Sequence, residues 1–247
     1  MIQENFNEWY NQRLPDGGPV YAETELGNLI VEPWNAFSSL LILIPAFYWL
    51  YQIRGRFSHY RFMLFAIPLI VLGGLGSALF HGFRVSTVFL VMDFLPSAIL
   101  TLSISIYLWI KIFKRWWYVF FVIIPAFLVR GLFWGNLPQH VAINVSYFTT
   151  GVIVALPLLI ILIKTKFRHS LIVAGAIIPF MIALLFRQLD ANEFSFLPMG
   201  THFLWHVFSA VGAYFVLKYL YILREIDVKP KSSPVAENHS SAEKQAV

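Results

Sequence analysis

Long apolar stretches separated by short polar ones dominate the chain. A membrane-spanning helix needs about 20 predominantly apolar residues, and seven stretches of this kind follow one another along the sequence. They cover residues 31–51, 61–81, 88–110, 116–134, 141–163, 170–187 and 201–222. The pattern therefore predicts an all-α membrane protein whose fold is a seven-transmembrane-helix bundle.

Polar segments flank this predicted bundle, which covers residues 31–222. Residues 1–30 form an acidic segment that we expect outside the membrane, before the first helix. Residues 223–247 are rich in Ser, Pro, Glu and Lys and contain few large apolar residues. Such a composition cannot offset the entropy of ordering by burial, so we expect a disordered cytoplasmic tail.

Composition agrees with an integral membrane protein. The mean hydropathy is +0.68, with 58% hydrophobic and only 13% charged residues, a balance outside the range of soluble globular domains. Cysteine is absent, which excludes disulfides, thiolate catalysis and cysteine-ligated metals. The pI is about 9.4, but the basic residues follow the loops instead of forming a stripe, so nucleic acid is not an expected partner.

The positions of the basic residues predict the orientation. Most of the 18 Lys and Arg residues fall in the segments after the first, third and fifth apolar stretches or at the C-terminal end. These are Arg54, Arg56, Arg61, Lys111, Lys114, Arg115, Lys164, Lys166, Arg168, Lys218, Arg224, Lys229, Lys231 and Lys244. Because cytoplasmic loops carry the excess of Lys and Arg, the N-terminus is expected outside and the C-terminus in the cytoplasm.

A few polar residues lie at membrane depth, where each ionisable group costs about 2.5–3.5 kcal/mol and needs a partner or a function. Ser77 and His81 are one turn apart at the outer end of the second stretch, and Asp93 lies about two turns into the third. His202 and His206 are one turn apart at the start of the seventh. The topology predicts that these residues share one depth near the extracytoplasmic leaflet.

Three histidines suit a catalytic zinc site. Three imidazole nitrogens bind zinc at about 2.0–2.1 Å and leave a fourth tetrahedral position open. Zinc lowers the pKa of a bound water to about 7, and Asp93 is suited either to accept its proton or to orient a ligating imidazole. Ser77 can donate a hydrogen bond to a developing oxyanion, although packing with the neighbouring glycines is an alternative role.

The order Ser-x-x-x-His, then Asp, then His-x-x-x-His across seven helices resembles the alkaline ceramidases and the wider CREST superfamily. The segments EPWNAFSSL, GSALFHGF, MDFLP and GTHFLWHVFSA are most similar to the ceramidase branch. This resemblance implies zinc bound by His81, His202 and His206, with Asp93 handling the zinc-bound water and Ser77 assisting at the carbonyl oxygen. A further segment, FRQLDANEF, which contains Arg187 and Asp190, also resembles a block of that family.

The resemblance also implies calcium near the start of the first helix, through the acidic segment YAETELGNLIVEPWN. Calcium takes six to eight oxygen ligands, which makes Glu23, Glu32 and Asn35 the candidates, with Glu25 and Asn28 weaker. The sequence departs from the family here, because the Trp-Cys-Glu stretch is missing and the spacing to Glu32 is shorter. A solvated acidic face is the alternative.

Together these features predict a zinc-dependent intramembrane amide hydrolase. Its expected substrate is ceramide or a related N-acyl lipid of the bilayer, cleaved to a fatty acid and a free sphingoid base or amine. Two other classes remain open: a seven-helix receptor or regulator in which zinc stiffens the bundle, and a metal transporter. The transporter is weaker because comparable polar groups do not continue through the cytoplasmic half.

Overall fold

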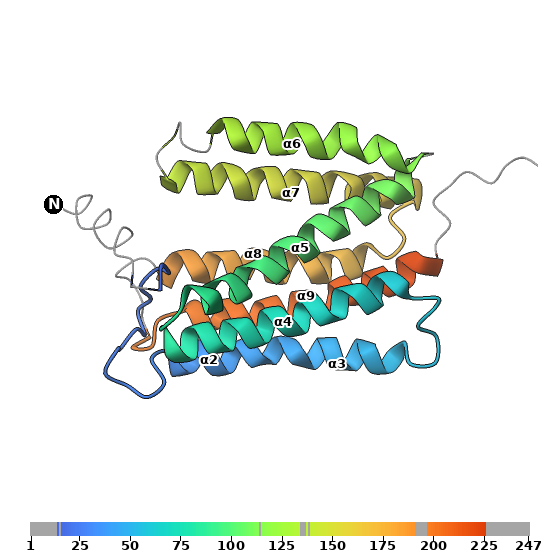
Figure 1. The fold of residues 1–247 in the computed structure, drawn as a ribbon. Coiled ribbons are helices and arrows are strands. Elements are labelled where there is room, and N and C mark those ends of the chain that lie inside the picture. The colour runs from blue at the N-terminus through green and yellow to red at the C-terminus, as the bar shows by residue number, and fades with distance from the viewer. Residues whose placement is uncertain are drawn as a thin grey trace, which may run out of the picture.

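The computed structural model describes residues 14, 16–113, 115–133, 137, 139–190 and 197–225, and the tail from residue 226 onward lies outside them. In this part of the chain, helices are joined by short loops and turns (Figure 1). The first membrane segment consists of α2 (Pro33–Ser39), η1 (Leu40–Ile42) and α3 (Leu43–Gln52). The others are α4 (Arg61–Phe83), α5 (Thr87–Ile112), η2 (Trp116–Val119) with α6 (Phe120–Phe133), α7 (Gln139–Lys164), α8 (Ser170–Asp190) and α9 (His202–Glu225).

The helices begin and end within about three residues of the predicted stretches, because the length of an apolar run sets the length of a membrane helix. Six of these segments are long and apolar enough to cross a membrane, and α7 contributes the shorter apolar stretch Phe148–Lys164. The all-helical, multi-pass architecture is thereby confirmed. The count of seven spans and the orientation of the termini stay predictions.

An inner group of helices is distinct from an outer pair. The segment α2 to α3 packs against α4 and α9, while α5 packs against α4 and α8 against α9. The helices α6 and α7 pack against each other, and α7 reaches the group through α5 (Figure 1). Only 6% of the apolar segment that contains α6 is buried inside the protein, compared with 50% of the segment formed by α9. The inner helices therefore form the frame of the protein.

The buried face of α4 changes character along its length. Toward its start, Met63, Ile67 and Ile70 join an apolar core that includes Leu217 and Leu220 of α9. Toward its end, the polar side chains of Ser77 and His81 are buried beside Phe80, and the loop before α2 covers this end together with the start of α9 (Figure 1). The bundle thus has an apolar half and a polar half, as the sequence predicted.

Glycines of α4 allow its neighbours to approach closely where the polar half begins. A Cβ atom at Gly76 would overlap the carbonyl oxygen and side chain of Met92 on α5. A Cβ atom at Gly74 would overlap the side chain of Ile42 and lie 3.4 Å from the carbonyl oxygen of Ser39. Small residues at such contacts are the usual means by which membrane helices pack. They bring α5 and the first segment to the polar end of α4.

Substitution of Gly76 tests this packing. Gly76→Ala inserts a methyl group against backbone, and overpacking of this kind costs about 1–3 kcal/mol. We expect the midpoint of thermal unfolding in detergent to fall by several degrees relative to wild type. Gly151→Ala in α7 is the matched control, because a Cβ atom there meets nothing within 4 Å. Equal midpoints for the two variants would contradict the close α4–α5 contact.

Candidate metal centre

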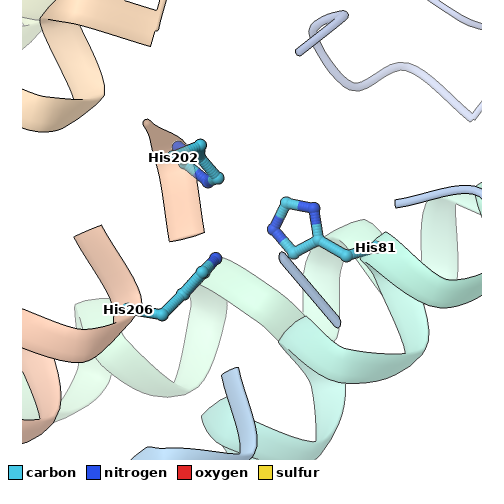
Figure 2. A group of neighbouring side chains, drawn as sticks. All are labelled: His81, His202 and His206. Carbon is cyan, nitrogen blue, oxygen red and sulfur yellow. The ribbon is translucent and has the colours of Figure 1, made fainter. Parts of the chain in front are cut away.

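Three histidines from two helices meet at the polar end of the bundle. His81 lies in the last turn of α4, while His202 and His206 occupy the first two turns of α9. The three side chains are buried, and their ligand nitrogens all lie within 4.8 Å of one another. Their rings surround a common space (Figure 2). The convergence predicted for these three residues is therefore present.

Each histidine has one buried nitrogen without a hydrogen-bond partner: Nε2 of His81, Nδ1 of His202 and Nε2 of His206. A buried polar atom without a partner costs about 1–3 kcal/mol, so three together indicate a site that can bind a cation. Within the residues that the structure describes, this is the group of His and acidic side chains that can share a metal ion. Nitrogen ligands in this number fit zinc.

Glu32 determines which nitrogen of His81 faces the metal space. Its Oε2 lies 2.5 Å from Nδ1 of His81, and its Oε1 accepts hydrogen bonds from Arg84 Nη1 at 2.5 Å and Thr24 Oγ1 at 2.6 Å. A carboxylate on one imidazole nitrogen fixes the tautomer and leaves the other nitrogen to ligate. Burial acts to raise the pKa of Glu32, but the bond with His81 and the charge of Arg84 outweigh it, so this pKa lies below its ordinary value.

Arg84 joins the loop before the first helix to this network. It follows α4 in the left-handed conformation (φ 53°) and its side chain is buried. Its Nε donates to Asp16 Oδ2 at 2.7 Å, and its Nη2 donates to Asp16 Oδ1 at 3.2 Å and to the carbonyl of Pro19 at 2.8 Å. One guanidinium thus holds two buried carboxylates, those of Asp16 and Glu32. No motif in the sequence marked Arg84 for this role.

Asp190, at the end of α8, positions His202. Its Oδ1 accepts backbone hydrogen bonds from Thr201 at 2.6 Å and His202 at 3.0 Å, and its Oδ2 accepts one from Ala22 at 3.3 Å. A carboxylate at the start of a helix satisfies the free N–H groups there and interacts favourably with the helix dipole. Gly200 (φ 72°) is required beside it, because a Cβ atom would overlap Oδ1 of Asp190. The family resemblance had marked Asp190 without giving it this role.

Ser77 and Asp93 lie beside the histidines. Ser77, one turn before His81, is buried, with its Oγ 3.0 Å from that of Ser39. Asp93 on α5 lies close enough to Ser77 and His81 for its carboxylate to interact with both side chains. Asp93 itself is only partly buried. The five residues predicted to share one depth are therefore neighbours in the fold.

Tyr21 covers the histidines from the loop before the first helix. Its ring stacks on that of His202, with centroids 4.1 Å apart, and lies 5.1 Å from that of His81. Burial is the main reason that the pKa of Tyr21 lies above its ordinary value. Its hydroxyl therefore stays protonated and able to donate. No periodicity or motif in the sequence pointed to Tyr21, because its position depends on how the loop folds back.

The residues predicted to hold calcium have other partners in the structure. Glu23 accepts backbone hydrogen bonds from Trp34 at 2.5 Å and Asn35 at 2.9 Å, and so caps the start of α2. Both oxygens of Glu32 face Arg84, His81 and Thr24, as described above. Of this set, Oδ1 of Asn35 is a buried oxygen without a partner. The calcium site stays a prediction.

Comparison with known proteins agrees with this geometry. A model of the protein family described as Ceramidase matches residues 25–243. The match includes the three histidines, Ser77 and Asp93, while Asp16 and Tyr21 precede it. A search of curated proteins found no match.

Loss of the Glu32 carboxylate tests how His81 is held. Glu32→Gln removes the negative charge from Nδ1 of His81, and loss of such a partner typically weakens metal binding 10–100-fold. We expect a decrease of this size in the affinity of purified protein for Zn²⁺, measured by competition with a chromogenic chelator. Glu25→Gln is the control, because Glu25 is exposed in the same loop. An unchanged affinity in Glu32→Gln would show that this carboxylate does not support the site.

Proposed function

Because the chain belongs to the ceramidase family, we propose that it is a zinc-dependent intramembrane hydrolase. It cleaves the amide bond of ceramide or a related N-acyl lipid and releases a fatty acid and a free sphingoid base or amine. The observation that carries this proposal is the set of three unpartnered, buried histidine nitrogens beside Asp93 and Ser77. Three protein ligands leave one position for water or substrate, as in catalytic zinc sites.

Zinc, held by His81, His202 and His206, supplies Lewis acidity and a water of lowered pKa. Asp93 accepts a proton from the attacking water and then delivers it to the nitrogen of the departing amine. Its partial exposure and its position beside Ser77 suit a group that must reach the substrate.

Ser77 donates to the substrate's carbonyl oxygen as negative charge develops there. A donor positioned in this way stabilises the transition state more than the ground state. Ser39, 3.0 Å away, orients the Ser77 hydroxyl. Placing these groups in the buried end of the bundle keeps bulk water from weakening their interactions.

The packing of the helices suits a lipid substrate. Among the described residues, α5 and α7 meet α8 in an apolar cluster that contains Leu108, Ile161 and Val173, at the end away from the histidines. Near the histidine end, Phe94 and Leu95 of α5 and Met181 and Leu185 of α8 expose apolar side chains. A lipid can therefore approach Asp93 laterally from the bilayer, with its acyl chain on apolar helix surfaces. The arrangement supports entry from the hydrocarbon phase over entry from water.

The alternative functions have less support. A metal that only stiffened the bundle would use a closed set of four ligands and would need neither Asp93 nor Ser77. A transporter needs polar groups along a path, but below the site Ile67, Ile70 and Leu217 belong to an apolar core. Both observations favour hydrolysis.

A direct assay tests the proposed reaction. Purified protein in detergent is incubated with ceramides of several chain lengths and with other N-acyl lipids, and released fatty acid and amine are quantified by mass spectrometry. We expect equal molar release of the two products by the wild type. His206→Ala, which removes one metal ligand, should reduce release to background. Release from no lipid by protein shown to contain zinc would refute the proposal and favour a receptor.

Asp93→Asn separates proton transfer from metal binding. The amide keeps the size of the side chain but cannot accept the proton, and a general base contributes about 10²–10⁴-fold to a rate. We expect turnover to fall by such a factor while zinc content, measured by inductively coupled plasma mass spectrometry, stays near that of the wild type. Asp227→Asn, in the tail, serves as the control. Wild-type turnover in Asp93→Asn would exclude the assigned role.

A further inference from the structure

An open cavity lies at the end of the inner helices away from the histidines. Its volume is about 420 Å³, and it is lined by the loop before α4 with the first turn of α4, the end of α5 and the end of α9. In Figure 1 these segments meet at the end of the bundle opposite the loop that covers the histidines. The helix α4 rises about 1.5 Å per residue, so Arg61 and His81 lie about 30 Å apart. The cavity is therefore separate from the metal centre.

The charged side chains that line this cavity are all basic. They are Arg61, Lys111 and Arg224, with His59 as a further titratable group and no Asp or Glu among the described lining residues. Arg61 Nε donates to the carbonyl of Ser58 at 3.1 Å, and Arg224 Nε donates to that of His59 at 2.9 Å. Because each arginine uses Nε for these bonds, the loop orients both guanidinium groups at the rim of the cavity.

Besides its basic side chains, the cavity has two features that suit an anionic lipid. The helix α4 begins at Arg61 with no side chain capping its N-terminus, and this terminus faces the cavity. Backbone N–H groups at such an end favour phosphate. The other wall is apolar. It is formed by the rings of Phe62 and Tyr107, which stack with their centroids 4.3 Å apart. The cavity thus combines positive charge with an apolar surface.

The neighbouring surface is suited to acyl chains. Phe57, Leu64, Phe65 and Ile110 expose large apolar side chains near the residues that line the cavity. The positive-inside rule assigns this end to the cytoplasmic side, where the leaflet contains anionic lipids. Basic pockets between membrane helices on that side bind anionic headgroups. A soluble phosphate compound would use the charges but not the apolar surface.

We propose that this cavity binds the phosphate headgroup of an anionic phospholipid, with Arg61 and Arg224 on the phosphate and the acyl chains on α4 and α5. Lys111 adds positive charge beside Tyr107, with its Nζ 3.0 Å from the carbonyl of Leu223. The bound lipid links the loop before α4 to the ends of α5 and α9. This inference is independent of the hydrolytic reaction at the histidines.

Native mass spectrometry of the purified protein tests the site. The protein is titrated with phosphatidate and, separately, with phosphatidylcholine of the same acyl chains. We expect tighter binding of phosphatidate and about 30-fold weaker binding in Arg61→Gln/Arg224→Gln, since each basic residue at such a surface contributes about 1 kcal/mol. Arg54→Gln/Arg168→Gln is the control, because it removes the same charge from the same side outside the cavity.

Three results would overturn the proposal: equal affinities for the two lipids, equal losses in the two double variants, or displacement of phosphatidate by millimolar inorganic phosphate. The last result would assign the cavity to a soluble phosphate compound. Thermal unfolding of both double variants is measured in parallel. Midpoints near that of the wild type confirm that a loss of affinity reports the site and not the fold.

Discussion

The carboxylate of Glu32 is the point on which the polar half of the protein depends. It lies between the guanidinium of Arg84 and the imidazole of His81. Buried charges are stable only when they are paired and hydrogen-bonded, and here each member of the network completes another. Asp16 and Glu32 carry two negative charges against one on Arg84, so the network alone has an excess of one. A divalent cation bound at the histidines, together with the charge of Asp93, would bring this sum to zero.

This balance of charge would connect binding of a metal ion with folding. Without a cation, the three imidazole nitrogens are buried and unpartnered, which opposes the close approach of α4 and α9. A ligand that binds only the folded state stabilises it by mass action, and metal ligands arranged across two helices are a direct case. The loop from Asp16 to Glu32 is also held against the helices at three points. Arg84 attaches it to the end of α4, Asp190 attaches it to α8, and its own Tyr21 contacts His202 of α9.

The sequence was sufficient to predict the helices and the proximity of five polar residues to one another. Apolar length defines the spans, and counting turns from each expected boundary places Ser77, His81 and Asp93 at one depth. The supporting residues were not predictable in this way. The direction of the Arg84 side chain depends on the left-handed backbone conformation of Arg84 itself, after the end of α4. Asp190 acts on a helix that begins twelve positions later. Tyr21 lies in a loop without periodicity. Their roles arise from contacts between loops, which no helical or charge pattern encodes.

The two ends of the inner helices place their polar groups differently, and α4 and α9 extend from one end to the other. At one end, polar groups must be buried together, so glycines and a covering loop bring the backbone close. At the other, basic side chains surround an open cavity at the membrane boundary, above a core that contains Met63 and Leu220. The apolar core between them separates the two sets of charges by about 30 Å along α4. Arg61 and Arg224 are exposed to solvent, which screens their charges over the distance to the histidines.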